Sequence, residues 1–289
     1  MDILTPQLTA DGSLTFFSST FQEAFHSHHG GKQEAESKFV MPCRVGAWAK
    51  TGHVRILDIC FGLGYNSAAA LTEIWRVNPD CQVELRGLEL NWDVPQQAIA
   101  QGGLGRWPAE IQEIISGLVT HLDYQGTNLQ ARLLIGDARQ TSQHLITDHW
   151  PADVIFLDPF SPPHCPQLWT VEFLKQISQL LAPRGYLATY SAAAAVRAAL
   201  QLAGLRVGST PPVGRKSPGT LARWLNADLP LLTPAEQAHL QTKAAIPYRD
   251  PGLDATATDI IHTRQQEQCQ SSLISTSQWR REWHISNSK

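Results

Sequence analysis

The chain has 289 residues, enough for one large α/β domain or for one domain with a small appendage. Hydrophobic residues make up 43% and charged residues 17%, which excludes an intrinsically disordered chain. The formal net charge of −3 does not by itself indicate a nucleic-acid-binding protein.

The five cysteines are scattered and form no Cys-x-x-Cys pair. This pattern favours a reducing compartment and argues against a disulfide framework or a zinc site. No apolar run is long enough to span a bilayer, and the N-terminus has no basic segment followed by an apolar one. We therefore expect a cytoplasmic protein.

Residues 1–50 are predicted to be a lead-in that packs on the main domain. Asp11-Gly12 between two apolar stretches predicts a short hairpin, and a helix is expected to begin near Lys32. Three histidines between residues 26 and 29 raise the question of a metal site. Glu34 and Glu36 are not at a recognised ligand spacing, so we expect no metal and interpret the loop as lining a substrate or cofactor.

The middle of the chain alternates between strand-like and helix-like patterns. Strands are predicted at residues 54–59, 83–88, 131–135, 154–157, 185–190, 205–208 and 220–224. Helices are predicted at residues 66–77, 94–101, 108–118, 138–147, 167–181 and 192–203. Such alternation predicts βαβ units with right-handed crossovers.

The predicted architecture is an α/β fold with a mostly parallel, seven-stranded sheet covered by helices on both faces. The last two strands are expected to form an antiparallel edge. We assign residues 51–228 to this domain and residues 229–289 to a C-terminal helical extension. The extension includes a helix that Thr233 and Glu236 begin by capping.

The first strand runs into a glycine turn and then a helix, which is the usual way to cradle a nucleotide-like cofactor. Gly62-x-Gly64 lacks the third glycine of a dinucleotide turn, and no Gly-Lys-Ser/Thr of a P-loop follows. Asp58 stands on the strand just before the turn. A carboxylate there suits the cationic methionyl part of S-adenosylmethionine.

Two further acids stand at the ends of the next two strands. Glu89 is placed to bind the ribose hydroxyls, and Asp137 to accept the adenine amino group. For either acid alone, a helix N-cap or a surface charge is at least as plausible an interpretation. Acids at three successive strand ends, with a glycine turn at the first, favour S-adenosylmethionine.

The fourth strand ends in Asp158-Pro159-Phe160, where open α/β sheets carry their chemistry. Methyl transfer from a sulfonium needs mostly positioning and desolvation. Asp158 is predicted to accept an N–H of an amine, aim its lone pair and take the released proton. Pro159 stiffens the loop, and Phe160 offers a flat face to a flipped pyrimidine. The alternative is a buried turn at a strand end.

Over roughly residues 8–225, the chain resembles the methyltransferase part of the MnmC/MnmD tRNA-modification enzymes. The motifs that carry the resemblance are Thr9–Ser13, His26-Ser27 with Glu34, Asp58–Asn66, Leu157–Pro162 and Gly214-Arg215-Lys216. The resemblance implies a class I S-adenosylmethionine-dependent methyltransferase fold that is Rossmann-like. It also implies N-methylation of the 5-aminomethyl group of wobble uridine in the tRNA anticodon stem-loop, giving 5-methylaminomethyl-(2-thio)uridine. A flavin-dependent oxidase part, present in two-domain relatives, is expected to be absent.

The residues assigned to the site fall into three groups. The catalytic group is Asp158 and Phe160, and the cofactor group is Asp58, Phe61, Gly62, Gly64, Asn66, Glu89, Asp137 and Ala138. The substrate group is His26, Ser27, Glu34, Pro159, Arg215 and Lys216. Two positions depart from the family pattern: Cys60 replaces the first glycine of the cofactor turn, and Phe25 replaces a tyrosine.

Charge is unevenly distributed along the chain. Residues 160–226 hold seven Lys and Arg residues against Glu172 alone, a formal charge of +6. This indicates either a solvated surface or a positive face for phosphates, with Arg215 and Lys216 grasping the tRNA backbone. Two alternatives to the tRNA methyltransferase stay open. One is a small-amine or aminopropyl transferase on the same fold, and the other is a non-catalytic RNA-binding protein with a degenerate cofactor site.

Overall fold

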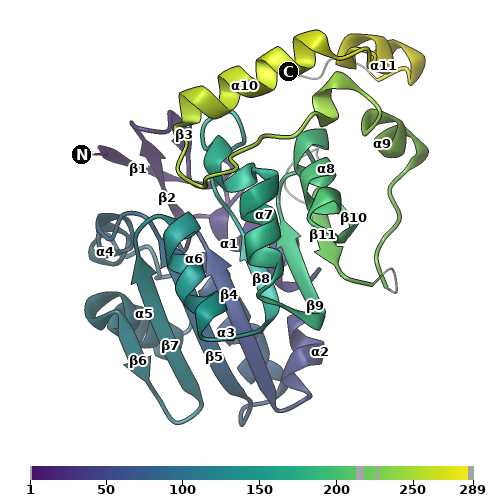
Figure 1. Cartoon of the computed structure of the whole chain (residues 1–289). Helices are drawn as coiled ribbons and strands as arrows, with labels where there is room; N and C mark the ends of the chain where they lie inside the picture. The colour runs from purple at the N-terminus through teal and green to yellow at the C-terminus, as the bar shows by residue number, and fades with distance from the viewer. Residues whose placement is uncertain (1, 213–217, 226–227, 286–289) are drawn as a thin grey trace.

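A computed structural model describes residues 2–212, 218–225 and 228–285. Its centre is a twisted eight-stranded sheet in the order β10-β11-β9-β8-β4-β5-β7-β6 (Figure 1). The strands are β4 (His53–Ile59), β5 (Gln82–Glu89), β6 (Asp123–Gln125), β7 (Leu129–Ile135), β8 (Ala152–Leu157), β9 (Leu181–Thr189), β10 (Arg206–Thr210) and β11 (Gly219–Arg223).

The inner strands are parallel, and the strand order reverses between β4 and β8. From β4 the chain proceeds outward to β5 and β7, and then returns to β8 on the other side of β4. In open parallel sheets, ligands bind outside the carboxyl ends of the strands at such a switch point. The ends of β4 and β8 are therefore where a site is expected.

Burial on both sides of the sheet explains the apolar runs of its central strands, Ile56-Leu57 in β4 and Val154–Leu157 in β8. Along β4, Val54 and Ile56 enter one hydrophobic cluster, whereas Leu57 and Ile59 enter the other, as the two-residue period of a strand requires. The helices of the domain are α3 (Tyr65–Val77), α4 (Asp93–Ala100), α5 (Ala109–His121), α6 (Ala138–Thr147), η2 (Pro166–Trp169), α7 (Val171–Ser178) and α8 (Ala194–Leu202). Helices α6 and α7 cover one face in Figure 1, with α3 behind the sheet.

The structure confirms the predicted α/β fold and the antiparallel edge, where β11 pairs with both β9 and β10. It adds an eighth strand, because three-residue β6 pairs antiparallel with β7 and is too short to carry a periodic signal. The prediction of a single helix over residues 167–181 is wrong. The chain breaks at Thr170, whose hydroxyl caps α7 at Phe173, and Leu181 already begins β9.

The N-terminal residues form a second, three-stranded antiparallel sheet of β1 (Leu4–Leu8), β2 (Leu14–Ser18) and β3 (Glu23–Ala24). The predicted hairpin is confirmed, with Leu8 opposite Leu14. The helix expected near Lys32 is α1 (Gly31–Glu34) followed by a π-helical stretch η1 (Ala35–Val40) and α2 (Val45–Ala49). The small sheet lies above the carboxyl ends of the main strands (Figure 1).

The C-terminal residues form α9 (Pro234–His239), η3 (Lys243–Ala245), α10 (Ala257–Gln270) and α11 (Thr276–Glu282). The capping box predicted from Thr233 and Glu236 is confirmed. Helix α10 crosses the top of the molecule, on the side of the strand ends (Figure 1). Among the described residues, no helix combines the length and apolar character that a membrane crossing requires.

Candidate active site

The turn after β4 contains three residues whose backbone is in the left-handed conformation. Gly62 and Gly64 have φ values of 54° and 80°, and Cys60 has a φ of 66°. Glycine adopts this region freely, whereas a residue with a Cβ pays about 1–2 kcal/mol. The turn nevertheless closes, since the amides of Cys60 and Phe61 both donate to the carbonyl of Leu88 at 2.9 Å. The cysteine is therefore accommodated at the position where the family pattern has glycine.

Glu89 braces this turn from the end of β5. One carboxylate oxygen accepts the amide of Gly62 at 2.8 Å, and the other accepts the amide of Asn91 at 2.9 Å. Burial raises the pKa of the Glu89 carboxyl. The Glu89 side chain also lines a cavity at the carboxyl ends of the strands, the central cavity, and its contact with the ribose stays a prediction.

Asp58 lies directly beneath the turn and is fully buried. Its Oδ2 accepts the Ser67 hydroxyl at 2.6 Å, while its Oδ1 finds no hydrogen-bond partner within the described part of the chain. Burial raises the pKa of Asp58 to about 7, and the charge of Glu89 adds to the shift. A buried acceptor without a donor is costly. A cation bound nearby would relieve this cost, but Asp58 does not line the central cavity, so its contact with the methionyl part of the cofactor stays a prediction.

Asp158, at the end of β8, lies beside the cofactor turn. Its amide donates to the carbonyl of Ile59 at 3.1 Å, and its Oδ2 accepts the side-chain amide of Asn66 at 2.9 Å. Asn66 is buried in the first turn of α3. The structure thus brings together two residues that sequence analysis had assigned to different groups.

Three side chains hold the loop that follows Asp158. The Tyr190 hydroxyl donates to the carbonyl of Pro159 at 3.0 Å, and the Trp169 indole donates to that of Phe160 at 2.9 Å. Glu23, from β3, accepts the amide of Ser161 at 2.9 Å. Trp169 is fully buried, whereas the roles of Tyr190 and Glu23 were not predicted from the sequence. No local pattern marks them, because each is distant in sequence from the loop it contacts.

Phe160 belongs to an aromatic cluster with the N-terminal residues. Its ring stacks on Phe21 with centroids 4.4 Å apart, and Phe25 meets it edge-on at 4.8 Å. One flat face of Phe160 is therefore covered by Phe21 rather than open to a base. The predicted stacking of a pyrimidine on Phe160 would require the other face or a displacement of Phe21.

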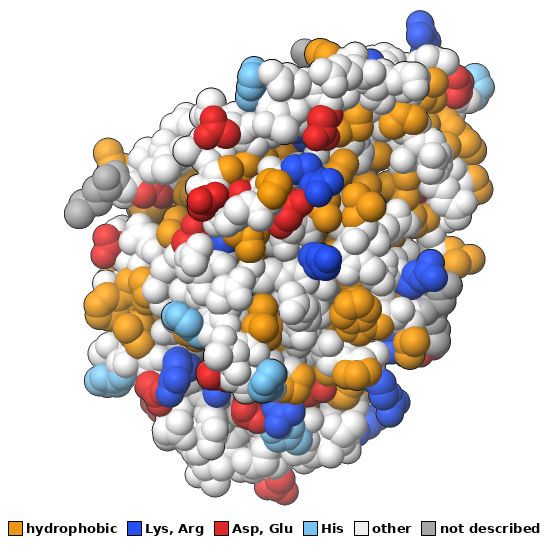
Figure 2. Space-filling model, viewed as in Figure 1, with side chains coloured by type: hydrophobic (Ala, Val, Ile, Leu, Met, Phe, Trp, Pro, Cys, Tyr) orange, Lys and Arg blue, Asp and Glu red, His pale blue; other side chains and the backbone are white. Residues whose placement is uncertain are grey.

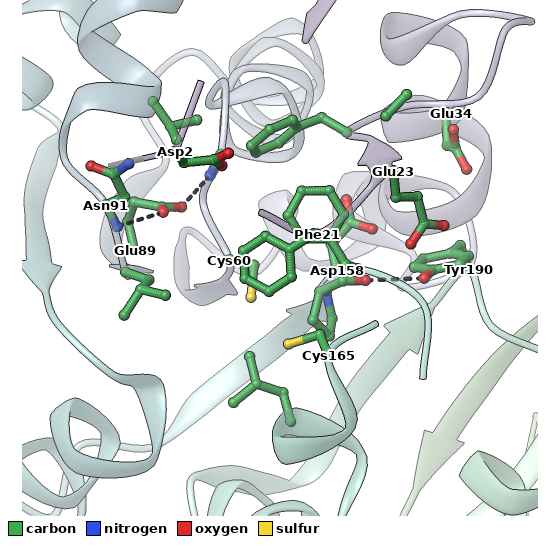
Figure 3. A pocket seen from close by; sticks show the side chains of 18 residues that line it. Asp2, Phe21, Glu23, Glu34, Cys60, Glu89, Asn91, Asp158, Cys165 and Tyr190 are labelled. Atoms are coloured by element: carbon green, nitrogen blue, oxygen red, sulfur yellow. Dashed lines mark hydrogen bonds between the residues drawn. The ribbon is translucent and has the colours of Figure 1, made fainter. Parts of the chain in front are cut away.

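The central cavity, of about 100 Å³, lies between the carboxyl ends of the strands and the N-terminal sheet. Five carboxylates line it: Asp2, Glu23, Glu34, Glu89 and Asp158. Among the described residues that line it, none is Lys, Arg or His. Figure 3 shows Glu23, Glu34 and Tyr190 on one side, with Asp2, Glu89 and Asn91 on the other. A partly buried pocket of this composition favours cations.

The predicted substrate residues of the N-terminal loop lie at the edge of this site. The His26 ring stacks on Tyr65 at 4.9 Å, and both residues line a second cavity of about 20 Å³ with Asn66 and Asp158. The Ser27 amide donates to Glu34 at 3.1 Å. His26 thus borders the smaller cavity, and Glu34 borders the central one.

Asp137 is placed differently from the other two strand-end acids. It caps α6 by accepting the amide of Arg139 at 2.9 Å, and it forms an ion pair with the Arg139 guanidinium at 2.7 Å. It does not line the central cavity as the structure describes it. Ala138, the first residue of α6, is buried. The cap that sequence analysis kept as an alternative role is present, and the adenine contact stays a prediction.

The positively charged stretch is only partly at the surface. Arg197 is 2% exposed and bound to Glu236, and Arg223 is 5% exposed and bound to the Tyr186 hydroxyl, so neither reaches a phosphate. Lys175, Arg184 and Arg206 are exposed, whereas Arg215 and Lys216 lie outside the described residues. On the face in Figure 2, Lys and Arg side chains are scattered among acids.

Comparisons with known proteins agree with this geometry. Residues 95–224 match a family described as S-adenosyl-L-methionine-dependent methyltransferase. The crystal structure of MnmC2 from Aquifex aeolicus superposes with a TM-score of 0.82 at 33% identity, covering 94% of this chain and 87% of that one. A protein from Acidovorax sp., named tRNA 5-methylaminomethyl-2-thiouridine biosynthesis bifunctional protein MnmC, is 30% identical over 70% of this chain and 33% of its own length. Its Ralstonia nicotianae counterpart is 31% identical over 76% of this chain and 34% of its own length.

The fold, the acidic pocket at the strand ends and these relatives define a class I methyltransferase that uses S-adenosylmethionine. The chain belongs to the MnmC-type methyltransferase family. It spans about a third of the length of the two relatives named MnmC above.

Proposed function

We propose that this protein transfers the methyl group of S-adenosylmethionine to the nitrogen of the 5-aminomethyl group of wobble uridine in tRNA. The product is 5-methylaminomethyl-(2-thio)uridine. The observation that carries the proposal is the position of Asp158, which faces an acidic cavity and is tied to the cofactor turn through Asn66. The printed names of the MnmC relatives supply the tRNA and the modified base.

The acidity of the pocket suits an amine substrate. An alkyl amine has a pKa of roughly 10 and arrives as an ammonium ion. Asp158, Glu23 and Glu34 attract this cation, and the low dielectric of a partly buried cavity strengthens the attraction. The nitrogen must then lose a proton to present its lone pair, and Asp158 is placed to accept this proton.

The bound cofactor supplies an electrophilic methyl group on a sulfonium. The residues of the chain bind and orient the two reactants, and they exclude water. Asn66 fixes the Asp158 carboxylate, while Tyr190 and Glu23 hold the loop that carries it. Phe21, Phe25 and Phe160 keep the cavity apolar around the amine. Such positioning and desolvation supply most of what an in-line displacement needs.

A small-amine or aminopropyl transferase is the second candidate, because the same acidic lining would suit a polyamine. The family membership favours tRNA over a free polyamine. The non-catalytic alternative was supported mainly by Cys60, which replaces a glycine of the cofactor turn. The turn closes with Cys60 in place, and this weakens the non-catalytic alternative.

Nucleoside mass spectrometry of tRNA from cells with and without the gene tests the proposal. We expect 5-methylaminomethyl nucleosides to disappear and 5-aminomethyl nucleosides to accumulate in the cells without the gene. Unchanged tRNA nucleosides together with an altered polyamine profile would favour the second candidate.

A further inference from the structure

The C-terminal residues 247–255 are fastened to the N-terminal ends of two helices of the main domain. The amide of Val171, at the start of α7, donates to the carbonyl of Tyr248 at 3.1 Å. Glu172 accepts the amide of Asp250 at 2.8 Å and pairs with Arg249 at 2.7 Å. In Figure 1 this part of the chain passes over α7 before α10 begins.

Asp250 is the most buried charge of this segment, with 1% of its surface exposed. Its Oδ2 accepts Nη1 of Arg139 at 2.9 Å. Its Oδ1 accepts the amides of Asp254 and Ala255 at 3.2 and 3.1 Å. The Arg139 side chain is itself 11% exposed, so this ion pair is largely removed from water. Removing Arg139 would leave the buried Asp250 carboxylate without this counter-charge.

The other end of the Arg139 guanidinium holds Asp137. Nη2 donates to Oδ2 of Asp137 at 2.7 Å, and Nε lies 3.0 Å from the same oxygen. Because a guanidinium is planar and its donors point in fixed directions, Arg139 relates the position of Asp250 to that of Asp137, which its own cap bond to the Arg139 amide also holds. Asp250 and Asp137 are 113 positions apart in the sequence and share this one arginine.

Asp137 does not line the central cavity itself, but its charge acts on Cys165, which does. Cys165 lines that cavity, and its thiol has a pKa raised to about 12, mainly by burial, with the charge of Asp137 adding to the shift. The Asp137 side chain keeps 35% of its surface exposed. Both carboxylate oxygens of Asp137 accept hydrogen bonds from Arg139, and a further donor such as an exocyclic amino group would share them.

We propose that Asp250 is a positioning residue for cofactor recognition, which acts through Arg139 to hold Asp137 in the orientation that selects the adenine amino group. The inference rests on the predicted contact between Asp137 and adenine, and it does not depend on which amine accepts the methyl group. It gives the C-terminal extension a role in cofactor specificity.

Calorimetry on the full chain tests this with two ligands that differ at one group. S-adenosylhomocysteine carries the adenine amino group, and S-inosylhomocysteine carries a carbonyl oxygen there, which faces a carboxylate unfavourably. The wild type is expected to prefer the adenosyl ligand by roughly tenfold or more, since hydrogen bonds to charged groups are strong. Asp250→Asn keeps the shape and an acceptor for the two amides, but it loses the charge that holds Arg139.

In Asp250→Asn we expect the adenosyl ligand to bind about fivefold more weakly while the inosyl ligand is nearly unchanged, so the preference falls. Arg139→Lys should give the same selective loss, because an ammonium cannot hold both carboxylates in one plane. Arg249→Gln is the matched control, since Arg249 pairs with Glu172 and not with Arg139. It should keep the wild-type preference.

Three results would overturn the inference. One is equal affinity of the wild type for the two ligands, which would show that Asp137 does not recognise the adenine amino group. Another is an Asp250→Asn variant with the wild-type preference or with equal losses for both ligands, which indicates a general structural role. The third is a loss in Arg249→Gln as large as that in Asp250→Asn. None of these bears on the proposed tRNA reaction, which is read from the methylated product.

Discussion

Asn66 and Asp158 are joined by a hydrogen bond of 2.9 Å although 92 residues separate them in the sequence. The bond connects the first turn of α3, which follows the cofactor turn, to the end of β8, which carries the proposed catalytic carboxylate. The residue proposed to receive the proton is thereby fixed relative to the turn proposed to hold the methyl donor.

Asp158→Ala should abolish methyl transfer but leave the affinity for S-adenosylmethionine within a few-fold of the wild type. Loss of a proton acceptor at the reacting amine should lower kcat by at least about 100-fold. Asp158→Asn should fail nearly as badly, because an amide orients the amine but takes no proton. Single-turnover assays and calorimetry measure the two effects. Near-normal turnover in both variants would remove Asp158 from the mechanism.

Asn66→Ala should lower kcat by about 10- to 100-fold, since it frees the Asp158 carboxylate to rotate and small misplacements are costly in catalysis. In the double variant with Asp158→Ala, the Asn66 substitution should have almost no further effect on rate. A double-mutant cycle measures this coupling. Additive losses would show that Asn66 acts independently of Asp158.

Cys60→Gly should stabilise the protein by about 0.5–1 kcal/mol, because it removes the left-handed strain at φ 66° while adding some flexibility to the unfolded chain. The matched control is Cys60→Ala, which removes the thiol but keeps the Cβ. Urea unfolding should show stabilisation by glycine and none by alanine. Equal effects of the two substitutions would assign the change to the thiol.

The raised pKa of Asp58, about 7 in the folded protein, predicts a pH dependence of stability. Below about pH 4 the carboxyl is protonated in both states and contributes nothing. As pH rises toward 7, the unfolded chain ionises first, so the free energy of unfolding falls, and above 7 the loss is constant. Asp58→Asn cannot titrate, so urea unfolding at pH 5 and 8 should show it gaining stability relative to wild type at the higher pH. A constant difference would contradict the shift.

Arg215 and Lys216 are predicted from the sequence to contact tRNA phosphates. The logarithm of tRNA affinity should then fall against the logarithm of salt concentration with a slope of about −2 to −4. The double alanine variant should make the slope shallower by up to about two. The exposed pair Lys175 and Arg184, changed to alanine together, serves as a control. A slope changed only in the control would move the tRNA to that part of the surface.

The sequence predicted the strand ends and the cofactor turn because both follow local patterns, namely apolar runs that stop at an acid or at glycines. It could not predict Glu23 or Asp250, whose partners lie 138 and 111 positions away. The charge count over residues 160–226 also included Arg197 and Arg223, which are buried. Composition could not predict this burial, because the residues that cover them are distant in the sequence. The division into residues 1–50, 51–228 and 229–289 remains a prediction.

The most direct measurement of the central claim combines purified protein, S-adenosylmethionine with a deuterated methyl group, and tRNA that carries 5-aminomethyluridine at the wobble position. Digestion and mass spectrometry should place the label on the side-chain nitrogen of that nucleoside, and the Asp158→Asn protein should give almost none. An unlabelled wobble nucleoside, or a label on another base or on an added polyamine, would contradict the proposed reaction.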